Sequence, residues 1–347
     1  MPKLSRRDFL KTAAVGTGVL AASALLDACG AAIPTPAAST DTPVPSPELP
    51  TATRLSPTDG RAAPTETPPS PSATTQLPPD LVVTRGGEPE ELVRRALAAL
   101  GGMEKFVPAG ARVIVKPNIC VDFRTYEYAA TTNPWVVGTL VKLCFEAGAA
   151  SVKVMDFPFS GTQEQAYQTS GIKEQVEAAG GEMAYMHRDN FIPTDNPAGI
   201  ILKKASVHED ILNTDVLINV PVAKTHGSSR LTLGMKNLMG VVLDRGAIHA
   251  NLAQCIADLN ALVRPELTVI DAVRIMTAYG PSGGSLNYVK KLDTLIASRD
   301  IVAADSYAAG LFGMKPEDLA YIVAGTSMGL GRSDLQNLRI EEITLGT

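Results

Sequence analysis

The stretch that decides the fold reads Arg112-Val-Ile-Val-Lys116, a run of three β-branched residues between two cations. A short, continuous apolar run of this kind predicts a strand that is buried on both faces, as in a parallel sheet. Residues 134–147 predict a helix after it, started by Thr132-Asn133 and stopped by Gly148. A buried strand followed by a helix is the repeating unit of α/β proteins, so we expect the rest of the chain to continue it.

The same alternation runs toward the end of the chain. Strands are predicted at residues 151–155, 215–220, 267–270, 292–297 and 338–345. Helices are predicted at residues 164–179, with a break near Gly171, and at 248–263, 301–311 and 316–323. The predicted fold class is therefore α/β: a mostly parallel, Rossmann-like layered sheet with helices on both faces.

Polar side chains of several kinds follow the predicted strands or lie between them. Lys116 and Asn118 follow the first strand, Asp156 follows the second, and Asp271 follows a later one. The remaining candidates lie between residues 221 and 250: Lys224, His226, Lys236, Asn237 and His249. Ligands of such sheets bind outside the carboxyl ends of the strands, so we expect these nine side chains to meet along one edge.

The nine candidates divide by their chemistry. Ammonium groups attract carboxylate or phosphate oxygens and amides fix orientation, so four residues are predicted to bind substrate: Lys116, Asn118, Lys236 and Asn237. Imidazoles titrate nearest to neutrality, so the predicted catalytic set is His226, His249 and Lys224. Asp156 and Asp271 would orient the imidazoles or hold a divalent metal. The alternatives are structural: a solvated lysine, a helix-capping aspartate or a histidine that begins a helix.

The composition argues against several classes of protein. A formal net charge of −5 gives no electropositive footprint for nucleic acid. The four cysteines, at 29, 120, 144 and 255, include no close pair, so neither a disulfide framework nor a CxxC metal site is expected. Cys120 is the best candidate for a reactive thiol, and a buried apolar role is the alternative. The sequence lacks the motifs of serine hydrolases, Walker-type nucleotide triphosphatases and HExxH zinc proteases.

Several short motifs occur in a distinctive order. They are Val115-Lys-Pro-Asn118, Thr132-Asn-Pro134, Asn219-Val-Pro221, Lys224-Thr-His226, Leu233-Gly-Met-Lys-Asn-Leu-Met-Gly240, His249, Asp271, Gly280-Pro281 and Ala304-Asp305. Together they resemble the domain of unknown function 362 family over about residues 112–334. The resemblance implies that the nine candidates form one site, and it names no reaction. Many relatives look like iron–sulfur proteins through appended cysteine cassettes; this chain has no such cassette, so we do not expect an iron–sulfur cluster.

The chain begins with a predicted export signal, residues 1–29. Ser5-Arg-Arg-Asp-Phe-Leu-Lys11 is typical of substrates of the twin-arginine translocase. The apolar stretch 12–26 is shorter than the roughly 20 residues that a permanent transmembrane helix needs. Leu26-Asp-Ala-Cys29 resembles a lipobox, which predicts that lipidated Cys29 anchors an extracytoplasmic protein to the membrane. The alternative is cleavage near Ala28 or Ala32 and a secreted soluble product.

Residues 30–80 are predicted to form a disordered linker. From residue 31 this stretch holds 13 of the 25 prolines, is otherwise rich in Thr, Ser and Ala, and has no aromatic residue. Such a composition cannot bury enough apolar surface to offset the entropy of ordering. The remaining residues, 81–347, are predicted to be the α/β domain that resembles the family.

Two functions follow from these features. The first is an exported, membrane-tethered enzyme that acts on a small anionic substrate, a carboxylate or a phosphate, with or without a metal. The second is a tethered, non-catalytic protein that binds an anionic ligand or a metal. The predicted partners are therefore a small anion, the twin-arginine translocase and, through the lipid anchor, the membrane.

Overall fold

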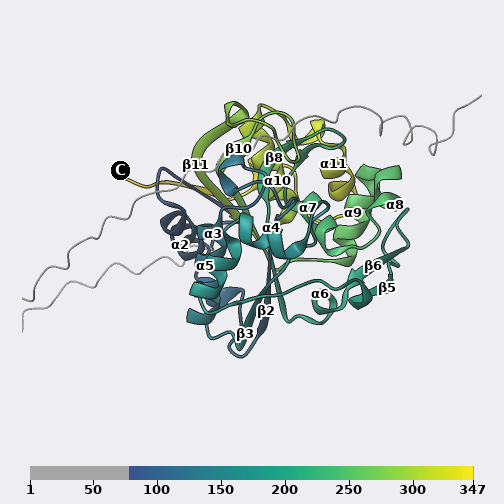
Figure 1. The fold of residues 1–347 in the computed structure, drawn as a ribbon. Coiled ribbons are helices and arrows are strands. Elements are labelled where there is room, and N and C mark those ends of the chain that lie inside the picture. The colour runs from purple at the N-terminus through teal and green to yellow at the C-terminus, as the bar shows by residue number, and fades with distance from the viewer. Residues whose placement is uncertain (1–77, 347) are drawn as a thin grey trace, which may run out of the picture. The chain divides into compact units, whose positions relative to one another are not determined.

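The computed structural model describes residues 78–346; the predicted signal peptide, Cys29 and residues 30–77 of the predicted linker lie outside the described residues. The strands of the main sheet are β1 Leu81–Arg85, β2 Arg112–Pro117, β3 Ser151–Val154, β4 Glu182–Met183, β7 Val216–Val220, β8 Val222–His226, β9 Arg230–Thr232, β10 Leu267–Met276, β11 Val289–Ser298 and β12 Ile340–Thr344. Their order is β12-β1-β11-β10-β7-β2-β3-β4, and β8 joins at β10 and pairs with β9. The paired strands β2 and β3 lie side by side in the lower part of Figure 1. A separate two-stranded sheet contains β5 Phe191–Asp195 and β6 Lys204–His208.

The sheet is mostly parallel. Strand β2 pairs in parallel with β3 and with β7, and β7 pairs in parallel with β10. The β3–β4, β8–β10 and β1–β12 pairs are parallel as well, whereas β11 is antiparallel to both of its neighbours and β9 is antiparallel to β8. The predicted mostly parallel α/β sheet is therefore confirmed.

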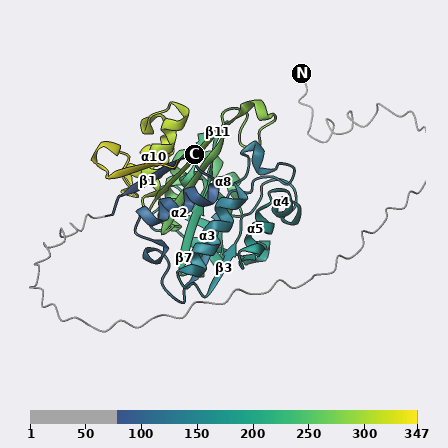
Figure 2. The same ribbon diagram turned by 90° about the vertical axis from the view of Figure 1, so that its left-hand side faces the viewer.

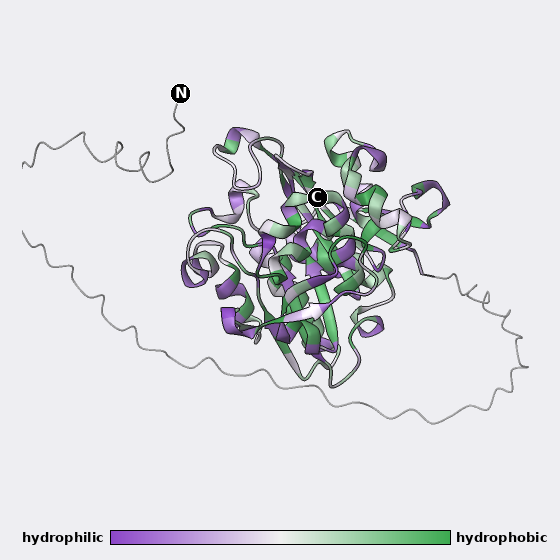
Figure 3. Cartoon of the chain, turned by 90° about the vertical axis from the view of Figure 1, so that its right-hand side faces the viewer, coloured by the Kyte–Doolittle hydropathy of each residue, from purple (hydrophilic) through white to green (hydrophobic). Residues whose placement is uncertain are grey.

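Helices cover both faces of this sheet. They are α2 Pro89–Ala99, α3 Pro134–Glu146, α4 Gln163–Thr169, α5 Ile172–Ala178, α6 Glu209–Asn213, α7 Gly234–Asn237, α8 Arg245–Ala250, α9 Leu252–Leu262, α10 Ile301–Ala309 and α11 Ala320–Ser327. Helices α2, α3 and α5 lie on the side that faces the viewer in Figure 2. In Figure 3, predominantly hydrophobic central strands lie among helices that also carry hydrophilic residues.

The apolar run at residues 113–115, which predicted the first strand, contributes side chains to the hydrophobic cores on both faces of the sheet. Successive side chains of a strand point to opposite faces. Val113 and Val115 of β2 pack in the apolar cluster that includes α2, α3 and α5. Ile114 packs in the other cluster, with α9, α10 and α11. One strand thus supplies apolar side chains to two cores, which is why its sequence has no polar alternation.

Several elements differ from their predicted bounds, and one strand near the site was not predicted. Strand β10 continues beyond residue 270 to Met276, so Asp271 lies inside the strand and does not follow it. After Pro221 the chain forms a further strand, β8, which pairs with β10 and was not predicted. The helix predicted at 248–263 is two helices, because Asn251 (φ −141°, ψ 67°) separates α8 from α9.

The first residues of the described chain lie beside its last strand, β12, and the segment before that strand. Asp80 forms ion pairs with Arg332 and Arg339, at 3.1 and 3.4 Å. Strand β1 then runs parallel to β12. Within residues 78–346, no helix is both long enough and apolar enough to cross a bilayer.

Candidate functional site

A cavity of about 380 Å³ lies at the carboxyl ends of β2, β3 and β8 and against α7 and α8. Seven of the nine predicted site residues line it: Asn118, Asp156, Lys224, His226, Lys236, Asn237 and His249. Its other lining residues include Ile119, Cys120, Phe157, Phe159, Met239, Arg245 and Pro281. The fold therefore brings side chains that are more than 100 residues apart in the sequence, such as Asn118 and Lys224, to one cavity.

Amides connect the lysines of the site. Lys116 Nζ donates a hydrogen bond to Asn237 Oδ1 (3.1 Å), and Asn118 Nδ2 donates to the same oxygen (2.8 Å). Lys224 Nζ in turn donates to Asn118 Oδ1 (2.8 Å) and to the carbonyl oxygen of Ala130 (2.6 Å). The Oδ1 atoms of both asparagines thus already accept hydrogen bonds, and the two amides hold the lysine side chains in position.

Lys116 lies behind the cavity wall, where it pairs with Asp156. Its Nζ is 2.7 Å from Asp156 Oδ1, and both side chains are buried. Asp156 Oδ2 accepts a second hydrogen bond from the backbone N–H of Ile119 (2.6 Å). Burial lowers the pKa of Lys116, and the attraction of Asp156 opposes that effect. The only carboxylate among the residues that line the cavity is therefore neutralised by a lysine from behind.

A glycine allows this pair to form. A Cβ on Gly240 would lie 2.0 Å from Asp156 Oδ1 and 2.6 Å from Lys116 Nζ. Both distances are shorter than any contact that a methyl group can make, so only glycine fits at this position. Gly240 itself lines the cavity.

Three further cations face the cavity, and none of them forms an ion pair with a carboxylate among residues 78–346. Lys224 is fully buried, and Lys236 is only 8% exposed. The nearest polar contact of the Lys236 ammonium is the Met239 sulfur, at 3.8 Å. Burial, and then repulsion from Lys224 and Arg245, lowers the pKa of Lys236 to about 8. The cavity thus holds an excess of positive charge.

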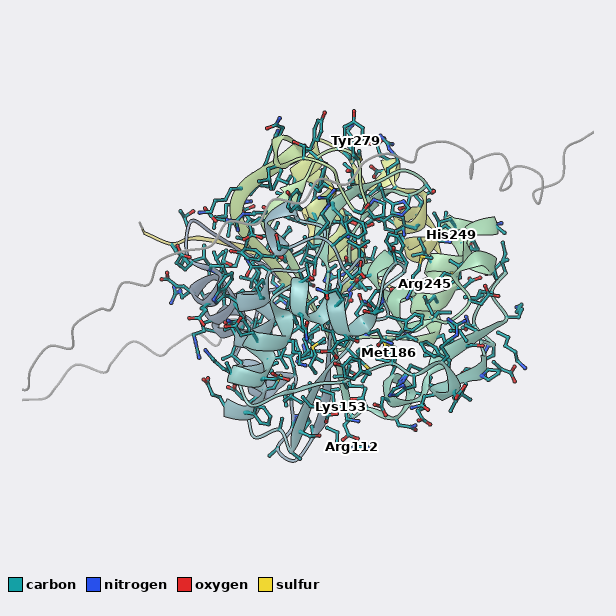
Figure 4. The ribbon with its side chains drawn as sticks, in the orientation of Figure 1. Arg112, Lys153, Met186, Arg245, His249 and Tyr279 are labelled. Carbon is teal, nitrogen blue, oxygen red and sulfur yellow. The ribbon has the colours of Figure 1, made fainter. Side chains whose placement is uncertain are left out.

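Arg245, the third cation, was not predicted as a site residue. Its guanidinium donates to the carbonyl oxygens of Phe157 and Val242, and burial lowers its pKa. Arg245 and His249 both belong to α8, four residues apart (Figure 4). Because residues i and i+4 share one helix face, this spacing was a signal in the sequence that could have added Arg245 to the site.

The two imidazoles are held by backbone groups in opposite ways. Nδ1 of His226 accepts a hydrogen bond from the N–H of Ser228 (3.1 Å), so a neutral ring carries its proton on Nε2. Burial, with the charges of Lys236 and Lys224, lowers the pKa of His226 to about 3 and keeps this ring neutral. Nδ1 of His249 lies 2.7 Å from the carbonyl oxygen of Arg245, which can only accept, so a neutral His249 ring carries its proton on Nδ1 and its lone pair on Nε2.

Asp271 does not belong to this cavity. Its carboxylate accepts the N–H of Asn133 (2.7 Å) and that of Val273 (3.0 Å), which fixes the start of α3. Burial raises its pKa to about 6, although these hydrogen bonds lower it. The structure therefore corrects its predicted placement: backbone groups, and neither Asp271 nor Asp156, orient the imidazoles.

The donor set is a poor fit to a divalent metal. Asp271 is absent from the cavity, and both oxygens of Asp156 already accept hydrogen bonds. The remaining donors are His226, His249 and the Cys120 thiol, and three cations line the same cavity. Among residues 78–346, no three His, Cys, Asp or Glu side chains are grouped so as to hold a metal ion.

Asp305 supports the site from outside. It is buried in α10 and accepts the N–H groups of Gly234 (2.6 Å) and Met235 (2.9 Å), which open the short helix that carries Lys236. Burial raises its pKa to about 7. It lies about 70 residues from its partners along the chain, so only the family resemblance, which included Ala304-Asp305, pointed to it.

A comparison of the chain with sequence models of protein families agrees with the resemblance that the order of the motifs indicates. The sequence model described as "Domain of unknown function (DUF362)" matches residues 113–310 of the chain. The chain belongs to the DUF362 family. All nine predicted site residues of this DUF362 member, and also Arg245 and Asp305, lie within the matched region.

Comparisons of this DUF362 member with individual proteins and solved structures give similar chains at 25% identity or less. A thylakoid-associated protein of Synechocystis sp. is 25% identical over 247 residues, which cover 69% of this chain and 74% of that protein. The lactate racemase apoprotein of Thermoanaerobacterium thermosaccharolyticum aligns at 14% identity and a TM-score of 0.38, covering 61% of this chain and 53% of its own. A structural-genomics target from Thermotoga maritima aligns at 13% identity and a TM-score of 0.38, covering 65% and 60%. The alignments thus span less than two thirds of these two solved structures, and TM-scores of 0.38 are too low to inform function.

Proposed function

We propose that the cavity binds a small anion, a carboxylate or a phosphate, and that the protein is an enzyme that moves a proton on this substrate. The observation that carries the proposal is the Lys236 ammonium group. It is almost fully buried, the one polar contact that it makes with residues of the described chain is a thioether at 3.8 Å, and it lies close enough to Lys224 and Arg245 for their charges to lower its pKa. A buried charge without a partner costs several kcal/mol, so the site is organised for a group that is added from solution.

The three cations suit an anion with more than one oxygen. Lys224 uses two of its three N–H donors, on Asn118 and on the Ala130 carbonyl, and keeps one. The Arg245 guanidinium has five donors, and its contacts with two carbonyl oxygens leave several free. Carboxylates and phosphates present oxygens that accept such donors.

The imidazoles supply complementary proton-transfer groups. His249 offers a free Nε2 lone pair at the exposed rim of the cavity, and His226 offers an Nε2–H. We assign His249 as the proton acceptor and His226 as the hydrogen-bond donor to charge that develops on the substrate. Lys224, which was expected to be catalytic, acts in this proposal by fixing the anion and stabilising negative charge.

Anion binding is tested by thermal unfolding with phosphate, sulfate or acetate against sodium chloride of equal ionic strength. We expect the wild-type protein to be stabilised and Lys236→Met to lose that stabilisation. Lys290→Met, at an exposed position outside the cavity, is the matched control and should behave like the wild type. Equal stabilisation of Lys236→Met and wild type would remove the basis of the proposal.

Catalysis is tested separately, by incubating the protein in D2O with a panel of small carboxylates and phosphate esters. Mass spectrometry should detect deuterium on one class of substrate, and His249→Gln should lower the rate by roughly 100-fold or more without weakening anion binding. Anion binding with no exchange on any member of the panel would favour the non-catalytic binding protein.

We also propose, from the sequence alone, that the protein is exported through the twin-arginine translocase and anchored by lipidated Cys29. The motif at residues 5–11 and the lipobox-like residues 26–29 support this proposal. Labelling of growing cells with a fatty-acid analogue should mark the wild-type protein and not Cys29→Ala. Labelling of both, or of neither, would contradict the anchor.

A further inference from the structure

We infer that the substrate is an amphipathic anion, whose charged head lies on Lys224 and Lys236 and whose apolar substituent packs against Phe159. This inference rests on the proposed function and specifies the class of substrate. Its starting point is the unequal distribution of lining residues: the two lysines are almost fully buried, whereas the Phe159 ring is 55% exposed. The cavity therefore has charged groups at its floor, and its mouth carries the Phe159 ring as well as His249.

Phe159 is held at this mouth by backbone on both sides. Its own N–H donates to the carbonyl oxygen of Cys120 (3.1 Å), and the N–H of Phe157 donates to the carbonyl oxygen of Gly240 (3.2 Å). Cys120 and Gly240 themselves line the cavity. The loop that carries the ring is thus tied across the cavity wall.

The apolar surface continues from Phe159 into the cavity. The ring of Phe157 packs edge-on against Phe191 and lies under the Arg245 guanidinium, 5.4 Å from the ring centre. Ile119, Met239 and Pro281 add further apolar lining. A bare inorganic anion would satisfy the lysines and leave this surface in water, whereas an aryl or alkyl substituent would cover it.

A volume of about 380 Å³ also exceeds what a bare anion needs. It falls within the range of small-molecule pockets that take a molecule of several carbon atoms together with its charged group. Charge at the floor and an exposed aromatic ring at the mouth then set the orientation: the anionic group enters first.

The test compares phenyl phosphate with methyl phosphate by isothermal titration calorimetry, so that head group and charge are the same. Phenyl phosphate should bind about tenfold more tightly to the wild-type protein, which is the effect of covering part of an aromatic ring. Phe159→Ala should remove most of this ratio and leave the methyl phosphate affinity within about twofold. Phe159→Leu, which keeps an apolar side chain, should retain part of it.

The matched control is Phe123→Ala. Phe123 is also 55% exposed, but it does not line the cavity, so its removal should leave both affinities unchanged. Methyl phosphate binding without a gain for phenyl phosphate would overturn the inference and leave the proposed function intact. An equal loss of both ligands in Phe159→Ala would also overturn it, by making the ring structural. Failure of both ligands to bind the wild-type protein would reject the proposed anion site itself.

Discussion

The ammonium group of Lys116 lies 2.7 Å from Asp156 Oδ1, and both side chains are buried at the wall of the cavity. This pair decides the charge of the site. Because Asp156 pairs with Lys116, its single negative charge offsets the charges of Lys224 and Arg245 only in part. The residues that line the cavity consequently carry an excess of positive charge although the whole chain carries a formal net charge of −5.

Removal of Lys116 should therefore cost much more stability than removal of the pair. Lys116→Met leaves the Asp156 carboxylate buried without its ion-pair partner, and we expect the free energy of unfolding to fall by about 3–5 kcal/mol. Lys116→Met combined with Asp156→Asn should recover part of that loss. Urea denaturation of the two single variants and the double variant gives the coupling energy, and a value near zero would show that the two groups are independent.

Gly240 should tolerate no side chain. Because its Cβ would overlap both Asp156 and Lys116, Gly240→Ala is expected to lower the free energy of unfolding by about 1–3 kcal/mol and to weaken anion binding. Gly227→Ala is the matched control, since nothing lies within 4 Å of a Cβ at that position. Circular dichroism during thermal unfolding would compare the two, and equal melting temperatures would contradict the close approach.

Lys236→Met should stabilise the protein in the absence of ligand. The substitution removes a buried cation that has no acidic partner, and we expect the free energy of unfolding to rise by roughly 2 kcal/mol at pH 7. The sign of the pH dependence checks the cause. The pKa of Lys236 falls from an ordinary 10.5 to about 8 on folding, so the unfolded chain binds more protons between these values. The stability that Lys236 contributes should therefore increase from pH 8 to 10.5, and this increase should be missing in the variant.

The same titration sets the pH range of anion binding. Below about pH 8 Lys236 is protonated and attracts an anion; above it the neutral amine does not. The affinity for sulfate, whose own charge is constant here, should thus decline above pH 8 and approach a tenfold loss per pH unit. Calorimetry from pH 6 to 10 measures this, and an affinity that is constant through pH 9.5 would assign the site to other cations.

Much of the fold follows from local sequence because the apolar patterns are strong. The run at residues 113–116 is buried, and Asn133 caps α3 where the Thr132-Asn133 signal predicted its start. Parallel pairing of β2 with β3 and β7 then brings Asn118, Asp156 and the segment after Pro221 to one edge. The clustering of the lysines and amides is a consequence of that topology.

The errors have long-range causes. An aspartate inside a buried strand contradicts the apolar pattern, which therefore predicts that the strand ends at Ile270; the carboxylate is accommodated because Asn133, 138 residues away, donates to it. The predicted end of the earlier strand at Val220 is correct, but the pattern does not predict β8 after Pro221, because β8 depends on pairing with β10. The support of Lys236 by Asp305 likewise depends on tertiary contacts that local patterns do not contain.

The opposite proton positions of the two site histidines can be observed directly. Long-range proton–nitrogen NMR correlations distinguish the two neutral forms of an imidazole ring, and the chain has only four histidines to assign. At pH 7.5 we expect His226 to carry its proton on Nε2, because its Nδ1 accepts from Ser228, and to remain neutral down to pH 5, since its pKa is lowered to about 3. We expect a neutral His249 ring to carry its proton on Nδ1, because the carbonyl oxygen of Arg245 can only accept. Single His226→Gln and His249→Gln variants assign the signals. If both rings carried the proton on Nε2, His249 would have no free lone pair at that nitrogen, and its role as proton acceptor would have to be abandoned.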